Sequence, residues 1–201
     1  MILCIAIIST AVIVSAYFTD YVLKDNTITP AENVIEISED YEPPVEQEAG
    51  DNIYKKEIKF VNKANAPCYV RVYMDFSESE VRSRSYLSND PDQSPESFFS
   101  AERVMNGSTY ISKLSTVAPG WVFVPDESTS VMAGYYYYVK PVPVGESTTP
   151  LMTYVKTINE TENDIKQYDI MVYSESIQLS DDDGRVFTDY ADAWESTVEQ
   201  Q

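Results

Sequence analysis

The chain has 201 residues, and 43% of them are hydrophobic. It contains 14 Lys and Arg residues and 33 Asp and Glu residues, which gives a net charge of −19. This length fits one well-buried domain, and the negative field excludes nucleic acid as a partner because it repels phosphate backbones. The sequence contains no His, which excludes Ser-His-Asp and Cys-His catalysis and His-ligated metal sites.

Residues 1–16 form an uncharged, largely apolar run that ends in Val14-Ser15-Ala16, the small-residue pattern that a signal peptidase reads. We predict a signal peptide here, cleaved between Ala16 and Tyr17. No basic residue precedes the run, so it stays open whether the signal begins further upstream. An uncleaved membrane anchor is the alternative, and we expect membrane contact only through this segment.

Residues 17–32 follow as an extended segment that has no obvious hairpin partner and contains Pro30. A strand with open backbone donors can add to the sheet edge of another molecule. The candidate assembly strand consists of Tyr17, Phe18, Thr19, Asp20, Tyr21, Val22 and Leu23. The alternative is a first strand packed within the protein's own sheet.

From residue 33 to 201 the pattern is that of a β-sandwich domain. Residues 68–76 alternate strictly, with Cys68, Val70 and Val72 on one face and polar or aromatic residues on the other. Turn residues separate the runs, and no βαβ alternation appears, so we predict an all-β, jelly-roll-like sandwich. Further strands are expected at 33–38, 54–60, 121–124, 135–142, 151–158 and 169–179.

Two local predictions concern connections. Residues 62–67 (NKANAP) are typical of a turn, and predict a hairpin between the strands at 54–60 and 68–76. An insertion at about 77–113 is expected to hold one short helix from Pro95 to Met105, with Ser94 as its cap. Near the C-terminus, Tyr190 and Trp194 fit either a second short helix or a final strand.

The run Tyr135, Tyr136, Tyr137 and Tyr138 places aromatic rings on both faces of one strand. Such a strand either presents one face as a stacking platform for sugar or peptide, or is buried on both sides.

Candidate metal ligands are few. Asp181, Asp183 and Asp189 supply carboxylate oxygens around a turn and are weak candidates for Ca²⁺, although a solvated acidic loop is the simpler interpretation. Cys68 is expected to be a small buried hydrophobe and not a reactive thiol.

Several motifs in order along the chain resemble the TasA and camelysin family of exported Gram-positive proteins. They are AYFTD at 16–20, the Gly-x-x-Ile-x-Lys pattern at 50–55 followed by Val61-Asn62, GWV at 120–122, the run at 134–151 and DIMVYSESIQ at 169–178. The resemblance implies processing by a dedicated signal peptidase, a jelly-roll sandwich, and subunits of biofilm-matrix fibres that assemble by N-terminal strand donation. Camelysins are also described as metallo-endopeptidases.

The sequence therefore predicts a secreted extracellular structural protein of the cell surface or biofilm matrix, without cofactor and without enzymatic activity. Its partners would be copies of itself or related matrix subunits. A monomeric surface-binding module using the Tyr-rich face is the alternative. A camelysin-like peptidase is the least favoured, because without His a catalytic zinc would depend on carboxylates and Cys68.

Overall fold

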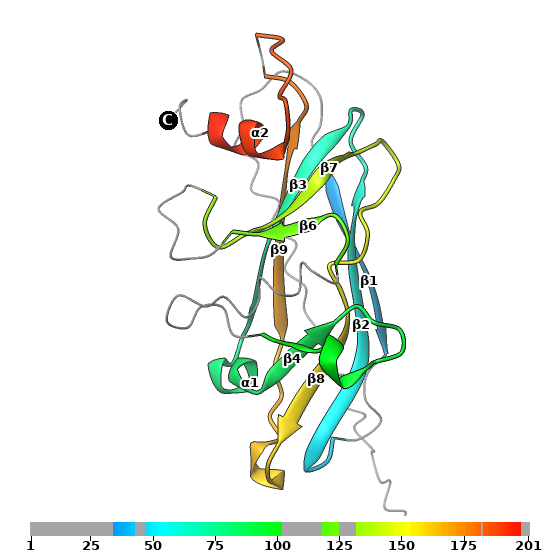
Figure 1. The fold of residues 1–201 in the computed structure, drawn as a ribbon, viewed down its shortest axis with the longest axis vertical. Coiled ribbons are helices and arrows are strands. Elements are labelled where there is room, and N and C mark those ends of the chain that lie inside the picture. Colours follow the sequence, from blue (N-terminus) through cyan, green and yellow to red (C-terminus); the bar gives the residue numbers. More distant parts are fainter. Residues whose placement is uncertain (1–33, 43–46, 102–117, 125–131, 182, 198–201) are drawn as a thin grey trace, which may run out of the picture.

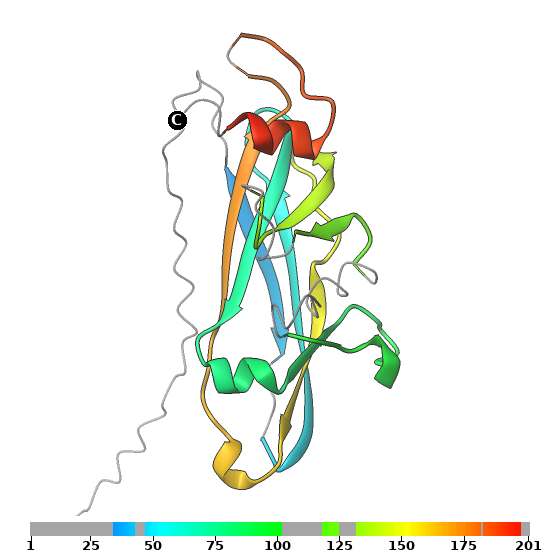
Figure 2. The same cartoon turned by 60° about the vertical axis from the view of Figure 1, so that its left-hand side comes forward.

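A computed structural model of the chain describes residues 34–42, 47–101, 118–124, 132–181 and 183–197. Two antiparallel sheets lie face to face along the long axis of the molecule, and a short helix lies across one end (Figures 1 and 2). The prediction of an all-β sandwich is confirmed. The jelly-roll connectivity stays a prediction.

The first sheet has the strand order β1-β2-β8-β4-β5 and the second β6-β7-β3-β9. The strands of the first sheet are β1 (Ile35–Glu42), β2 (Gly50–Asn62), β8 (Met152–Asn159), β4 (Ser85–Ser88) and β5 (Phe99–Ser100). Those of the second are β6 (Trp121–Phe123), β7 (Tyr136–Val142), β3 (Cys68–Phe76) and β9 (Ile170–Gln178). The described helices are α1 (Ser79–Ser83), η1 (Pro95–Ser97), η3 (Glu162–Asp164) and α2 (Tyr190–Ser196).

The main core fills the space between the two sheets. The apolar face predicted for β3 is buried there, from Cys68 through Val70 to Phe76, and it meets Ile58 and Phe60 of β2. The alternation of apolar and polar residues in β3 therefore predicts correctly which side chains point into the core, because successive side chains of a strand point to opposite faces.

A second, smaller core lies on the outer face of the second sheet, under α2. It joins Tyr69 of β3, Tyr137 of β7 and Ile177 of β9 to Ala193 and Trp194 of the helix. The sheet is thus buried on both faces at this end, which explains why Tyr69, on the polar face of the alternation, is only 4% exposed. Of the two structures open for Tyr190 and Trp194, the helix is observed, and Asp189 caps it by accepting a hydrogen bond from the backbone of Asp192 (2.9 Å).

The predicted hairpin between β2 and β3 is wrong. β2 pairs with β1 and β8, whereas β3 pairs with β7 and β9 in the other sheet. Asn62 holds the crossing connection, because its Nδ2 donates to the carbonyls of Ala66 and Val142 (both 2.9 Å). Both strands bury one face, and these two faces meet across the core instead of forming one continuous surface.

The predicted helix from Pro95 to Met105 is also wrong over its described part. Only Pro95–Ser97 form a single 3-10 turn, and Phe99 and Ser100 then pair with β4. Ser94 makes no side-chain cap; its backbone N–H donates to the Asp90 carboxylate instead (3.0 Å). In the described part of the insertion the α-helix is α1, and β4 and β5 extend the first sheet beside β8. Residues 102–113 lie outside the described part.

Candidate functional site

The tyrosines of β7 divide between the two cores. Tyr136 and Tyr138 point between the sheets, while Tyr137 is fully buried under α2 and donates its hydroxyl to the carbonyl of Met132 (2.8 Å). Tyr138 also lies against Gly120, where an added Cβ would stand 2.7 Å from its ring and φ is +89°. Three of the four rings are therefore inaccessible to a ligand, and only Tyr135 is half-buried.

Beside α2, Arg71 of β3 is the centre of a group of aromatic and charged side chains. Its guanidinium carbon lies 4.4 Å from the ring centre of Tyr135 and 4.1 Å from that of Trp194. Stacking of a cation on aromatic faces is favourable and strengthens as water is excluded. We call Arg71, Tyr135, Tyr173, Glu175 and Trp194 the Arg71 cluster.

The charges of the Arg71 cluster are satisfied internally. Arg71 forms an ion pair with Glu175, which lies directly opposite it on β9, and Tyr173 donates its hydroxyl to the other oxygen of the same carboxylate (2.8 Å). Both charges are thus paired within the protein. The cluster instead fixes the orientation of its rings.

The same outer face continues away from α2 along β3 and β9. Tyr73 of β3 meets Tyr135 edge to face with ring centres 5.9 Å apart, and it lies opposite Tyr173 of β9. Met171, further along β9, is 49% exposed. This part of the sheet offers ring surface and a flexible thioether, a combination suited to stacking or apolar contact.

Burial raises the pKa of several acidic groups in the two cores. The thiol of Cys68 rises from 9.0 to a pKa of about 12, and the phenol of Tyr137 from 10.0 to a pKa of about 12. The pKa of Tyr173 is also raised to about 12, first by burial and then by its hydrogen bond to Glu175. Cys68 is fully buried, so at neutral pH it is a protonated core residue.

These shifts predict a loss of stability in alkali. The unfolded chain ionises Cys68 and the tyrosines near pH 9 to 10, whereas the folded chain keeps them protonated to about pH 12. The stabilisation is complete below pH 9, and the free energy of unfolding should fall as the pH rises from 9 to 12. Urea titrations at each pH measure this fall in the free energy of unfolding. The variant Cys68→Ala should show a smaller fall at the start of the range, near pH 9, where the thiol of the unfolded chain ionises. A free energy of unfolding that stays constant from pH 8 to 11 would contradict the assignment.

A chain of hydroxyl groups lies between the sheets at the end opposite α2. The hydroxyls of Tyr54 and Tyr168 are in contact, Tyr168 lies 3.0 Å from the hydroxyl of Thr157, and that hydroxyl lies 3.0 Å from Ser85. Ser85 donates to the carbonyl of Val81 (2.8 Å), which ends the chain. Burial and the neighbouring Tyr168 raise the pKa of Tyr54. These groups satisfy one another, and they connect β2, β8 and β4 of the first sheet to Tyr168 in the segment before β9.

Strand β9 forms one edge of the second sheet. Among the described residues it pairs only with β3, so one side of its backbone has no strand neighbour there. Its sequence, IMVYSESIQ, contains one charged residue, Glu175, and no Pro. The edge strand β1 of the other sheet, IEISEDYE, carries four acidic residues. Charges on an edge discourage the addition of strands, so β9 is the better acceptor of the two.

The predicted Ca²⁺ ligands do not converge in the described structure. Asp181 accepts a hydrogen bond from the backbone of Arg185 (2.8 Å), and Asp189 caps α2. Among the described residues no three carboxylate or thiol side chains come together in a way that could hold a metal ion. The carboxylate of Asp181 therefore stabilises a turn, and that of Asp189 stabilises the first turn of α2.

The signal segment at 1–16, the cleavage site between Ala16 and Tyr17, and the assembly strand from Tyr17 to Leu23 all lie outside the described residues. Within the described residues no helix is both long and apolar enough to cross a membrane. No local pattern of the sequence indicates that Arg71, Tyr173, Glu175 and Trp194 form one group. The alternating pattern of β3 places Arg71 on the polar face of that strand. Only the strand order and the packing of α2 show that residues of β9 and of the helix lie beside Arg71.

Comparison with known proteins gives no relative: no family model matches the chain, and no curated protein matches it. The resemblance to the TasA and camelysin family therefore stays a prediction from the motifs.

Proposed function

We propose that this protein is a secreted structural protein of the extracellular matrix or cell surface that assembles into fibres by strand exchange. The edge strand β9, which among the described residues pairs only with β3, carries the proposal. An edge strand of nine residues with high β-propensity and one charge accepts a further strand through its main-chain groups. The segment at 17–32, released by signal cleavage, would supply that strand to a neighbouring molecule.

The charge of −19 favours a regulated assembly. Copies of such a chain repel one another at low ionic strength, and salt or partial protonation of the carboxylates removes this repulsion. Assembly outside the cell would therefore respond to salt and acidity. Copies of the chain or related matrix subunits are its partners in this proposal, and no cofactor is involved.

The experiment is light scattering on the mature chain, residues 17–201, across salt concentrations and from pH 7 down to about 4, close to the sequence pI of about 4.1. We expect scattering to grow with protein concentration and salt, and electron microscopy to show ordered fibres. A chain that stays monomeric under all these conditions would contradict self-assembly.

The second candidate function is a monomeric binding module, which the half-buried rings of Tyr73 and Tyr173 beside the exposed Met171 favour. Tyr73, Tyr173 and Met171 lie together on three positions of two paired strands. A stable monomer that binds a glycan or peptide saturably, with quenching of tryptophan fluorescence from Trp194 in the Arg71 cluster, would support this function over the fibre.

A further inference from the structure

Met171 is the most exposed of the methionines that the structure describes. The chain has six methionines, and the described residues include four of them. Met74, Met132 and Met152 are 1%, 5% and 0% exposed, whereas Met171 of β9 is 49% exposed. A thioether is oxidised where an oxidant can reach it, so oxidation follows exposure. Among the described methionines, a dissolved oxidant therefore reaches Met171 first.

The described cysteine does not compete with Met171 for an oxidant. Cys68 is fully buried in the main core, and burial raises the pKa of its thiol to about 12. The thiolate is the reactive form of cysteine, and at neutral pH this thiol stays protonated. The accessible sulfur atom of the described structure is thus the thioether of Met171.

Met171 lies at one end of the aromatic outer face of the second sheet. It stands directly opposite Asp75 of β3, and the next pair on the same face is Tyr73 opposite Tyr173. The carboxylate of Asp75 is paired with Arg82 (2.7 Å). On the other side of Met171 is the edge of β9, which has no strand neighbour among the described residues. A strand added there would place one of its Cβ atoms about 5 Å from that of Met171, the usual separation of directly opposite residues.

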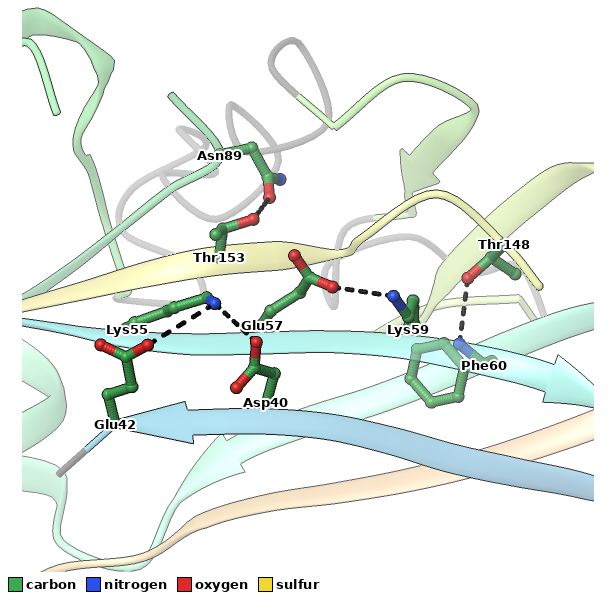
Figure 3. A network of polar contacts seen from close by, with 9 residues as sticks. All are labelled: Asp40, Glu42, Lys55, Glu57, Lys59, Phe60, Asn89, Thr148 and Thr153. Atoms are coloured by element: carbon green, nitrogen blue, oxygen red, sulfur yellow. Dashed lines mark hydrogen bonds and ion pairs between the residues drawn. The ribbon is translucent and has the colours of Figure 1, made fainter. Parts of the chain in front are cut away.

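The edge strand β1 of the first sheet has a polarity that an oxidant does not change. Its Asp40 and Glu42 pair with Lys55 of β2 at 2.5 and 3.8 Å (Figure 3). Such charges discourage further strands whatever the redox conditions. In β9, by contrast, the first four residues, IMVY, are uncharged. The oxidation state of Met171 therefore determines how polar this end of the β9 edge is.

We propose that Met171 is a reversible oxidation site, and that its sulfoxide weakens the addition of a strand at the edge of β9. The oxidant is a peroxide. The sulfur attacks one peroxide oxygen, the O–O bond breaks and an S–O bond forms, and the other oxygen leaves with both protons as water. Sulfur thereby loses the two electrons that the peroxide gains. Two thiols reverse the step, because they supply two electrons, become a disulfide and release the oxygen as water.

The sulfoxide changes what an added strand meets. The thioether is apolar and adapts its shape to a neighbour, whereas the S–O group is polar and keeps bound water. A side chain packed against it would have to remove that water, which costs free energy unless a hydrogen bond replaces it. Oxidation itself needs no assembly, but its effect on assembly rests on the proposed function.

Peptide mass spectrometry after timed exposure to hydrogen peroxide tests the oxidation site. The mature chain used here carries Met105→Leu, because Met105 lies outside the described residues. We expect the sulfoxide at Met171 to form at least about tenfold faster than at Met74, Met132 and Met152, which are buried. In urea, where the chain is unfolded, the four rates should become similar. Similar rates in the folded chain would overturn the oxidation site.

Light scattering of the same chain before and after oxidation tests the effect on the β9 edge. Fibre growth should slow about two- to fivefold on oxidation, the size of one cross-strand contact, and recover after treatment with a thiol-dependent sulfoxide reductase. Met171→Leu is the matched control, since it keeps an apolar side chain without sulfur. It should grow normally and not respond to peroxide. Met171→Gln, which is polar without oxidation, should grow slowly in both conditions.

The outcomes separate this inference from the fibre function. If peroxide slows the Met171→Leu variant as much as the unaltered chain, or if the chain oxidised at Met171 grows normally, the effect on the β9 edge is overturned. If the unaltered chain forms no fibres under any condition while Met171 is still oxidised first, the oxidation site stands and the fibre function fails.

Discussion

Deletion of residues 17–29 is expected to abolish fibre growth. The proposal gives this segment the task of completing the sheet of a neighbour, and without it the edge of β9 keeps no donor. The sandwich should still fold, because the described core contains no residue before Val34. Electron microscopy and light scattering of the shortened mature chain measure the effect, with circular dichroism as a check of folding. Intact fibres after the deletion would contradict the proposal.

A pair of substitutions tests the acceptor side of the same contact. Met171→Lys places a charge on the exposed face of the β9 edge and should slow growth strongly, because an edge charge opposes strand addition. Val122→Lys places the same charge on β6, the opposite edge of the same sheet, at a residue that is 37% exposed. Growth of this second variant should be normal. Equal inhibition by both would show a general effect of charge and not a contact at β9.

Tyr137→Ala is expected to lower the free energy of unfolding by about 3–5 kcal/mol, the usual cost of removing a large buried aromatic ring. Tyr137 is fully buried in the core under α2, and its ring meets those of Tyr190 (5.7 Å between centres) and Trp194 (6.2 Å). The loss is a large part of the stability of an ordinary domain. Urea unfolding followed by tryptophan fluorescence measures it.

The matched control is Tyr137→Phe, which keeps the ring and removes the hydroxyl that donates to the carbonyl of Met132. It should cost about 1 kcal/mol, the usual net contribution of one hydrogen bond. The Ala variant should also release α2 from the sheet, which near-ultraviolet circular dichroism would detect as weaker tyrosine and tryptophan signals. Equal costs for the two variants would mean that the ring contributes nothing to the packing of α2.

The strands were predictable because their signal is local. In residues 68–76 every second side chain is apolar, and the observed β3 has these bounds, with its apolar face in the main core. The same holds for β7 and β9, whose predicted bounds differ from the observed ones by one residue at one or both ends. A strand with one buried face shows it in its own sequence, whatever its neighbours are.

The pairing of these strands and their function were harder to predict from the sequence. The turn at 62–67 resembles a hairpin turn, yet Asn62 directs the chain across the core to the other sheet. The helix signals at Ser94 and Pro95 were outweighed by the pairing of Phe99 with Leu87 of β4. In both cases a distant partner supplied more stabilisation than the local preference, and no local pattern contains that partner.

The amino-acid sequence by itself determined the all-β class, the position of most strands, the strong negative charge and the exclusion of His chemistry, since all of these depend on composition or on neighbouring residues. Only the tertiary structure decided which strands are edges, that α2 buries Tyr137, that Arg71 stacks between Tyr135 and Trp194, and that the carboxylates of β1 face the lysines of β2. The physical reason is that these features join residues far apart along the chain, so they exist only once the two sheets have paired and packed.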